Sequence, residues 1–479
     1  MIRASLLVVG AILLGAGMLT WRVPPPRPRH GVAIASASVA PAVREAPIAG
    51  PRLAPNETRE EVALIRRDFL APSRSFSDAA RAEAESRLVK LEETKVDVSV
   101  ASFGLEACRI AALADDGHTA CNLWNLAGKY PAVPWNLAPL GNGIYVIGTT
   151  AENEDLLGAR LVGVEGQPID AVKDMAASLR GGTASSRALA LLPVVYTPAL
   201  LHALGIAHSP DAVTYQFATR DGHAIERSLS AAPPPAEWRW LVPQERTPWA
   251  WQRLDEPFRL RDAPELDAVI VQLRRNNDFA GRSLAEFLRS ADVEIKKRKR
   301  RNIVVDLRFD DGGDLTKTRD FMVGLPARVG RHKGHVFALL GPRTFSAGIS
   351  SAAYLKQAGG KRVVLVGEPP GDRMVFLAEG PTVVLPHSQL ELTAATARHD
   401  YHDACRAFDD CFVGVAQPGK HTGSPAKLEG LVARHPIAIA SLEPDVPASF
   451  TLDAFMSGHD PALDAIAPMI LPKKRAARP

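Results

Sequence analysis

The sequence has little net charge and few cysteines. Its 479 residues carry a formal charge of only +4 at pH 7, which gives no reason to expect a nucleic-acid partner. Only four cysteines are present, and none stands in the CxxC spacing that is typical of structural zinc sites. With 46% hydrophobic and 23% charged residues, the chain is expected to be a globular protein of two or three domains.

Long hydrophobic runs are also scarce. The longest uncharged run, Ala4 to Thr20, follows a basic start and is shorter than the roughly 20 residues that a membrane-spanning helix needs. Residues 1–22 are therefore predicted to be either a signal peptide, with Ala35-Ser36-Ala37 as a cleavage site, or an uncleaved membrane anchor. The Pro- and Ala-rich residues 23–57 are predicted to form an extended tether. Both alternatives export the main body to the cell envelope, the periplasm if the source is bacterial.

The cysteines fall into two close pairs, Cys108 with Cys121 and Cys405 with Cys411. Two local disulfides are the simplest pairing in an oxidising compartment, although other pairings and a zinc site are alternatives. A bridge between Cys108 and Cys121 would restrain the loop that carries His118.

One serine stands where a nucleophile could be activated. Residues 336–340 are predicted to be a buried strand, 346–357 a helix rich in small residues, and 362–366 a second strand. Ser346 then lies at the helix N-terminus, where unpaired N–H groups such as that of Ala347 favour an oxyanion. The alternative is an ordinary serine N-cap.

A glycine pair follows another predicted strand, residues 302–307. The turn Asp310-Asp311-Gly312-Gly313-Asp314 leaves the end of this strand, where open α/β sheets bind ligands. Either Gly312 or Gly313 is predicted to supply the second oxyanion donor beside the Ala347 N–H. Glycines after a strand are also ordinary turn residues.

Together these segments carry a family resemblance. Val304 to Asp314 (VVDLRFDDGGD), Thr344 to Gly348 (TFSAG) and Val363 to Glu368 (VVLVGE) resemble the serine peptidase family of tail-specific (C-terminal processing) proteases, the tricorn core and the interphotoreceptor retinoid-binding proteins. The resemblance implies an α/β multidomain fold. Its expected parts are a ClpP/crotonase-like β-α-β core, an inserted PDZ-like domain and an N-terminal helical cap.

The resemblance extends to both sides of these motifs. Leu385-Pro386-His387-Ser388 is similar to the LPxS strand of the family, and Glu443 to Val446 and Gly458 to Pro461 are similar to its closing segments. Asp116-Gly117-His118-Thr119 resembles the DGHT segment of the tricorn-like members.

The general base distinguishes two branches of the family. Tail-specific proteases use a lysine at a place that here reads Gly371-Asp372-Arg373, and an arginine cannot give up its proton to act as a base. The tricorn-like branch uses a histidine, and His118 occupies the corresponding place. The other candidates for the base are His387, His399 and His402.

No motif identifies the acid that would orient the base. Ile349 stands where many family members carry a glutamate. The candidates are Glu368, Asp310, Asp400 and Asp403, each of which is equally well explained as a turn or surface acid. A missing orienting acid favours a weak or inactive enzyme.

The predicted domain order follows from the motifs and from breaks in periodicity. It comprises a helical cap carrying His118 (58–138), a PDZ-like domain (139–231), a Trp/Pro-rich connector (232–251), the serine peptidase core (252–472) and a basic tail (473–479). The connector tryptophans are expected to pack a domain joint.

The predicted function is an exported serine-type endopeptidase that forms an acyl-enzyme on Ser346, with His118 as base. Its expected partners are peptides or unfolded proteins, captured by the PDZ-like domain, and the membrane if the N-terminal segment is retained. No metal or organic cofactor is implied. The alternative is a weak or inactive peptide- or lipid-binding protein on the same fold.

Overall fold

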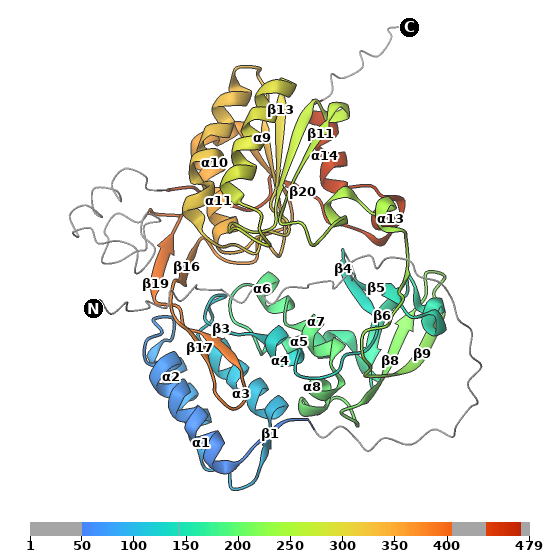
Figure 1. Cartoon of the computed structure of the whole chain (residues 1–479), viewed down its shortest axis with the longest axis vertical. Coiled ribbons are helices and arrows are strands. Elements are labelled where there is room, and N and C mark those ends of the chain that lie inside the picture. Colours follow the sequence, from blue (N-terminus) through green and yellow to red (C-terminus); the bar gives the residue numbers. More distant parts are fainter. Residues whose placement is uncertain (1–49, 142, 405–436, 471–479) are drawn as a thin grey trace, which may run out of the picture.

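The computed structural model describes residues 50–141, 143–404 and 437–470. The predictions for residues 1–22, for most of the tether, for Cys405 and Cys411 and for the basic tail fall outside these ranges. Figure 1 shows two bodies, an α/β unit at the top and a second body of helices and antiparallel sheet below it, here called the helix–sheet unit. Within the described ranges, none of the helices has both the length and the hydropathy to cross a membrane.

A six-stranded sheet forms the centre of the α/β unit. Its strand order is β11-β12-β13-β14-β15-β20, and all neighbours are parallel except β11 and β12. The strands are β11 (Phe258–Ala263), β12 (Ala268–Leu273), β13 (Asn302–Asp306), β14 (Val336–Leu340), β15 (Val363–Gly367) and β20 (Val446–Pro447). Continuous apolar runs such as β14 suit a parallel sheet, because helices cover both of its faces.

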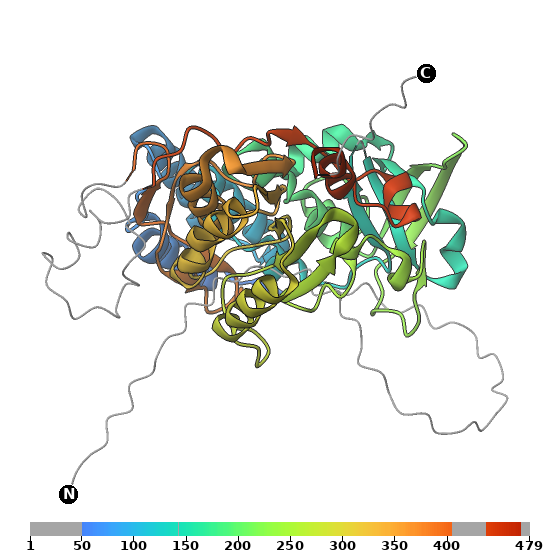
Figure 2. The ribbon, with the colours of Figure 1, turned by 90° about the horizontal axis from the view of Figure 1, so that it is seen from above.

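Helices cover the two faces of this sheet (Figures 1 and 2). One face packs against α9 (Leu284–Arg298), α10 (Leu315–Gly330) and α11 (Ala347–Gly359). The other face packs against α14 (Pro461–Ile470), which follows the short α13 (Leu452–Ser457). The predicted strand 336–340 and the helix after it are confirmed, with Ser346 immediately before the first helical residue.

A seven-stranded antiparallel sheet dominates one side of the helix–sheet unit. Its main path is β10-β5-β6-β8-β9, with β4 beside β5 and β7 beside β6. The strands are β4 (Asn136–Leu140), β5 (Gly143–Thr149), β6 (Arg160–Val164), β7 (Gln167–Pro168), β8 (Ala212–Ala218), β9 (Ala224–Ser230) and β10 (Arg239–Trp240). Its helices are α5 (Ile169–Ala177), α6 (Ala184–Ala188), α7 (Leu191–Tyr196) and α8 (Pro198–Ala203). Strands β8 and β9 form an antiparallel hairpin whose turn holds Asp221 and Gly222.

The N-terminal helices complete this unit. They are α1 (Pro55–Leu64), which continues into a π-helix (Ile65–Leu70), then α2 (Asp78–Glu92), α3 (Val100–Ala112) and α4 (Leu123–Ala127). The short strands β1 (Arg52–Leu53) and β2 (Val98–Ser99) pair beside them. The predicted tether is wrong at its end, because α1 begins at Pro55. Proline suits the first turn of a helix, and the Glu57 carboxylate accepts the Ala54 N–H at 2.8 Å.

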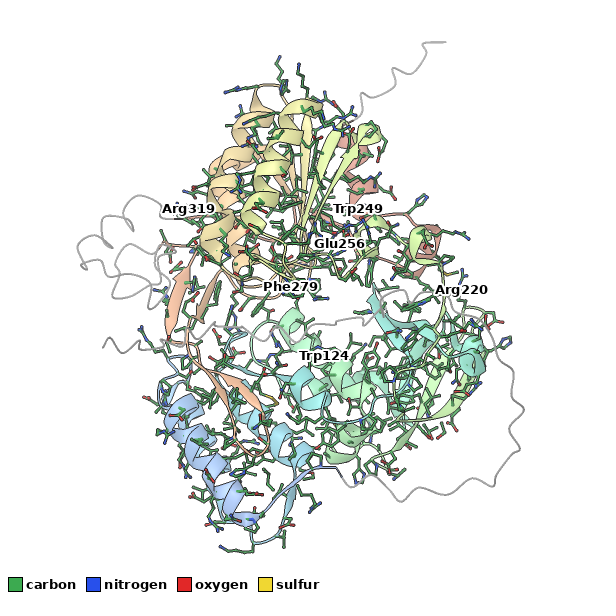
Figure 3. All side chains as sticks on the ribbon, in the orientation of Figure 1. Trp124, Arg220, Trp249, Glu256, Phe279 and Arg319 are labelled. Carbon is green, nitrogen blue, oxygen red and sulfur yellow. A yellow bond between two sulfur atoms is a disulfide. The ribbon has the colours of Figure 1, made fainter. Side chains whose placement is uncertain are left out.

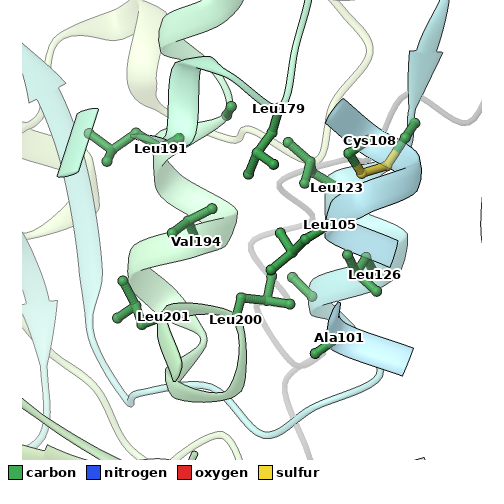
Figure 4. Packing of buried hydrophobic residues seen from close by; sticks show 14 of the residues in the cluster. Ala101, Leu105, Cys108, Leu123, Leu126, Leu179, Leu191, Val194, Leu200 and Leu201 are labelled. Carbon is green, nitrogen blue, oxygen red and sulfur yellow. A yellow bond between two sulfur atoms is a disulfide. The ribbon is translucent and has the colours of Figure 1, made fainter. Parts of the chain in front are cut away.

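These helices and the antiparallel sheet share one hydrophobic core. Figure 4 shows Leu105 of α3 close to Leu200 of α8, with Val194 of α7 to their left. All three side chains are fully buried. The range predicted as a cap and the range predicted as a PDZ-like domain therefore form one packed body.

The chain returns from the α/β unit to this body. Strand β17 (Thr382–Val384) pairs with β18 (Glu391–Thr393), and β18 pairs with β3 (Ala120–Cys121). Beside them, β16 (Val375–Ala378) pairs with β19 (Ala397–Asp400). A disulfide joins Cys108 of α3 to Cys121 of β3, as predicted. These contacts fasten the segment between α3 and β3, which carries His118.

The residues Leu385 to Ser388, predicted to be a strand, form the turn between β17 and β18 instead. Pro386 has no N–H to give to a ladder, and the N–H groups of His387 and Ser388 donate to the Glu61 carboxylate of α1 at 2.8 and 2.5 Å.

Aromatic residues of the connector pack where the two bodies meet. Trp251 contacts Phe309, Phe450 and Phe455 edge-on, in a cluster that also holds residues of β4 and β5. For Trp251 this confirms the expectation that connector tryptophans pack a domain joint, whereas Trp240 lies in β10 of the antiparallel sheet. In Figure 3, Trp249 lies beside the α/β unit and Arg220 lies on the helix–sheet unit. Arg220 pairs with Asp453 of α13 at 3.2 Å.

Candidate active site

Ser346 lies on a strained turn between β14 and α11. Its backbone has φ 52° and ψ −122°, a conformation that costs a non-glycine residue free energy and is found mainly at functional sites. The side chain of Ser346 does not cap α11, so it is not the ordinary N-cap that the sequence left as an alternative. The residue is half-buried, which leaves its hydroxyl reachable.

The loop that carries His118 is fastened at several points. Asp116 accepts the N–H groups of His118 and Thr119 at 2.8 and 3.0 Å, and the N–H of Leu377 at 2.9 Å. Burial raises the pKa of Asp116, and the nearby charge of Asp372 raises it further. These bonds hold the backbone of His118 in one position between the two bodies.

The imidazole of His118 is stacked between two phenyl rings. Phe345 lies on one face with ring centres 4.3 Å apart, and Phe376 of β16 lies against His118 at 4.8 Å. Only 5% of His118 is exposed. Because Phe345 precedes Ser346, this stacking brings the predicted base next to the turn that carries the predicted nucleophile.

A carboxylate faces the ring of His118. The Nδ1 atom of His118 lies 3.1 Å from Oδ2 of Asp372, and both side chains are almost completely buried. A carboxylate can only accept, so the proton between the two groups lies on Nδ1, and the tautomer of imidazole with one proton then has its lone pair on Nε2. Within the described ranges, Nε2 is buried and makes no hydrogen bond.

Asp372 was not among the acids singled out from the sequence. It lies in Gly371-Asp372-Arg373, a segment interpreted only for the lysine that it lacks. The segment packs on the nucleophile turn, since the Gly371 N–H donates to the Thr344 carbonyl at 2.9 Å. Arg373 turns away and pairs with Asp115 at 2.8 Å. The sequence did offer one signal for Asp372: an acidic residue stands at the place where the tail-specific proteases carry their lysine base.

The other histidines lie elsewhere. His387 pairs with Glu60 of α1 at 2.9 Å, and this contact raises its pKa. His402 pairs with its neighbour Asp403 at 2.8 Å. His399 stacks on Phe376, whose ring also stacks on His118, and burial lowers the pKa of His399. The structure therefore places His118, not these three, against Phe345.

The glycine turn lies directly against Ser346. A Cβ on Gly312 would stand 2.6 Å from Cβ of Ser346 and 3.1 Å from the Ala347 nitrogen, so only glycine fits. Gly312 and Gly313 have φ angles of 101° and 134°, which also favour glycine. Gly312 and Ala347, two of the residues predicted for the oxyanion hole, thus lie against Ser346, the predicted nucleophile.

The N–H groups of this turn differ in their partners. The Gly312 N–H donates to Oδ1 of Asp310 at 3.0 Å. The Gly312 carbonyl accepts the Asn276 N–H, and the Asp314 N–H donates to the Asn276 carbonyl. The Gly313 N–H therefore points away from Asn276. Among the residues that the structure describes, neither the Gly313 nor the Ala347 N–H donates a hydrogen bond. These two donors are open to an acceptor.

Comparison with known proteins gives a fold and no sequence family. No protein-family model and no curated protein matches the sequence. The structure of mature CPAF complexed with lactacystin matches with a TM-score of 0.53 at 12% identity, over 87% of this chain and 98% of that chain. A second structure, the crystal structure of mature CPAF, matches with a TM-score of 0.51 at 12% identity, over 86% and 96% of the two chains. The chain therefore has a mixed α/β multidomain fold that resembles the fold of mature CPAF.

Proposed function

We propose that the chain is a serine-type endopeptidase in which Ser346 is the nucleophile and His118 the general base. The observation that carries this proposal is the arrangement of His118, whose Nδ1 faces Asp372 while its ring stacks on the residue before Ser346. A base oriented by a carboxylate next to a strained serine is the arrangement that activates a hydroxyl at neutral pH.

In the proposed reaction the Ser346 hydroxyl attacks a peptide carbonyl carbon and its proton passes to Nε2 of His118. Asp372 stabilises the imidazolium that forms. The tetrahedral oxyanion accepts the N–H groups of Ala347 and Gly313. His118 then protonates the leaving amine, and water hydrolyses the acyl-enzyme with His118 again acting as base.

The histidine base favours the tricorn-like branch of the family over the branch with a serine and a lysine. Arg373, which stands at the lysine position, is held by Asp115 and points away from the chemistry. An arginine would in any case keep its proton. Asp372 takes the place of the glutamate that orients the histidine in that branch.

The substrates we propose are peptides or unfolded proteins. Residues 139–231 hold most strands of the antiparallel sheet, whose terminal strand, β9, is largely exposed and able to accept another strand. This supports the interpretation of the range as a PDZ-like domain that captures extended peptides. We also retain the proposal that the protein is exported, with a membrane contact through residues 1–22 if they are not cleaved.

One observation supports the rival function, a peptide- or lipid-binding protein without activity. Within the described residues, Nε2 of His118 makes no hydrogen bond to Ser346 or to any other group. Catalytic hydrogen bonds are often long before a substrate binds, so the same geometry fits an enzyme at rest. Activity has to decide between them.

The deciding experiment is labelling of the full chain with a fluorophosphonate, followed by mass mapping of the modified residue. We expect the wild type to be labelled at Ser346, Ser346→Ala not at all, and His118→Ala at least about 100-fold more slowly. No labelling of the wild type, together with no cleavage of unfolded protein, would overturn the peptidase proposal and favour the binding function. If His118→Ala is labelled as fast as the wild type, His118 is excluded as the base, while Ser346 keeps its role as the nucleophile.

A further inference from the structure

Asp310 contacts both segments that supply the open N–H groups. Its Oδ1 accepts the Gly312 N–H at 3.0 Å, and its carbonyl oxygen accepts the Phe345 N–H at 3.0 Å. The first bond holds the glycine turn and the second holds the nucleophile turn. One residue therefore sets the distance between the two turns.

The first turn of α11 packs directly on Asp310. A Cβ at Gly348 would stand 2.7 Å from the Asp310 carbonyl oxygen and 3.1 Å from its Cγ. Asp310 is completely buried, and its own N–H donates to the Leu307 carbonyl at 3.0 Å. The side chain has no room to take another position while both turns keep theirs.

Burial disfavours the charged form of the Asp310 carboxyl group. Burial raises its pKa well above the usual range. Of the charged groups that act on it, Asp311 raises the pKa further and Arg275 opposes the rise. Its Oδ2 is buried and, among the residues described, has no hydrogen-bond partner. A neutral group suits this place, because a negative charge beside the turns would oppose an oxyanion.

We propose that Asp310 is the positioning residue of the oxyanion hole. Its side-chain oxygen binds the Gly312 N–H, which leaves the Gly313 N–H facing the reacting carbonyl. Its main-chain oxygen binds the Phe345 N–H and so fixes the distance between the Ala347 N–H and the Gly313 N–H. This inference rests on the proposed function, and it adds a residue that does not touch the substrate.

The test compares variants that keep or remove the side-chain acceptor. Asp310→Asn keeps an acceptor oxygen and is neutral at every pH, whereas Asp310→Leu has a similar shape and no acceptor. Leucine is preferred to alanine because it leaves no cavity that might prevent folding. Asp445→Ala is the matched control, since the Asp445 carboxylate also accepts a backbone N–H, that of Leu365 at 2.9 Å, outside the site.

Two measurements are made on the full chain: the rate of fluorophosphonate labelling, and hydrogen exchange of peptides covering residues 307–316 and 342–350, followed by mass spectrometry. We expect Asp310→Asn to label within about threefold of the wild type and Asp310→Leu about 10- to 100-fold more slowly. Exchange in both peptides should rise in Asp310→Leu alone. Asp445→Ala should change neither measurement there.

The outcomes separate this inference from the proposed function. Wild-type labelling with an unchanged rate in Asp310→Leu would overturn it, and so would an Asn variant as slow as the Leu variant. If the wild type does not label, the peptidase proposal fails. Hydrogen exchange alone then decides whether Asp310 holds the two turns together. Faster exchange of both peptides in Asp310→Leu only would then keep Asp310 as the residue that holds the two turns, and unchanged exchange would overturn that role.

Discussion

The ring of Phe376 lies 4.8 Å from the ring of His118 and is inclined to it by only 8°. Phe345 stacks on the same imidazole at 4.3 Å. Residues from two distant segments thus set the plane of the ring, and the contact between Nδ1 and Asp372 sets its rotation within that plane. Orientation of a base in this way contributes to catalysis without any contact with the substrate.

Removing one of these rings should therefore slow the reaction. We expect Phe376→Leu to label with a fluorophosphonate about tenfold more slowly, because the imidazole is free to tilt. The labelling rate of the purified variant measures this. Phe258→Leu is the control, because Phe258 is also buried and packs against a ring, Phe287 at 5.3 Å. If both variants slow labelling equally, the effect is one of general stability.

Asp372 should be needed for its charge and not only for its size. Asp372→Asn places an amide against Nδ1 that can donate to it, which stabilises the wrong tautomer of His118. We expect labelling of Ser346 to fall by about 10² to 10⁴ while the thermal midpoint changes little. Arg373→Ala, which removes the neighbouring ion pair with Asp115, should stay within about threefold of the wild type. A fully active Asp372→Asn variant would exclude Asp372 as the orienting acid.

The bridge between Cys108 and Cys121 should stabilise the fold and the loop that carries His118. We expect the double variant with serines at both positions to lose about 3 kcal/mol in the free energy of unfolding, since the bridge closes a short loop of the unfolded chain. Urea unfolding of the two proteins measures the difference. A mass map that links Cys108 to Cys405 or Cys411 instead would contradict this pairing.

The state of Asp310 predicts how stability depends on pH. Burial raises its folded pKa well above the ordinary value of an aspartate, so the folded state holds this proton after the unfolded state has lost it. The favourable contribution is therefore complete below about pH 4 and is lost as the pH rises toward the folded pKa. Asp310→Asn is neutral throughout, so its stability relative to the wild type should increase with pH above about 4. Urea unfolding at a series of pH values measures this, and a relative stability that decreases with pH would show that Asp310 is ionised.

Much of the nucleophile side of the site could be predicted from local sequence. The apolar run of β14, the turn after it and the helix rich in small residues placed Ser346 before α11. The Gly312-Gly313 turn followed from its position after a buried strand. These features depend on residues close together in the chain, where periodicity and turn preferences apply.

The base side of the site could be predicted only in part. Resemblance suggested His118, but the acid that faces its ring was missed because Asp372 is 254 residues away along the chain. No spacing rule connects two loops that meet through the packing of separate bodies. The predicted strand at Leu385 to Ser388 failed for a related reason, since Glu61 of a distant helix binds its N–H groups.

The sequence by itself determined the order of the elements, the place of Ser346 at a helix N-terminus and the absence of a lysine at Arg373. Tertiary structure alone decided which histidine faces which acid, which glycine N–H remains open and which residue holds the two turns together. Local conformation follows from the preferences of neighbouring residues. The relative positions of catalytic groups depend on burial and hydrogen bonds that form only when distant segments pack against each other.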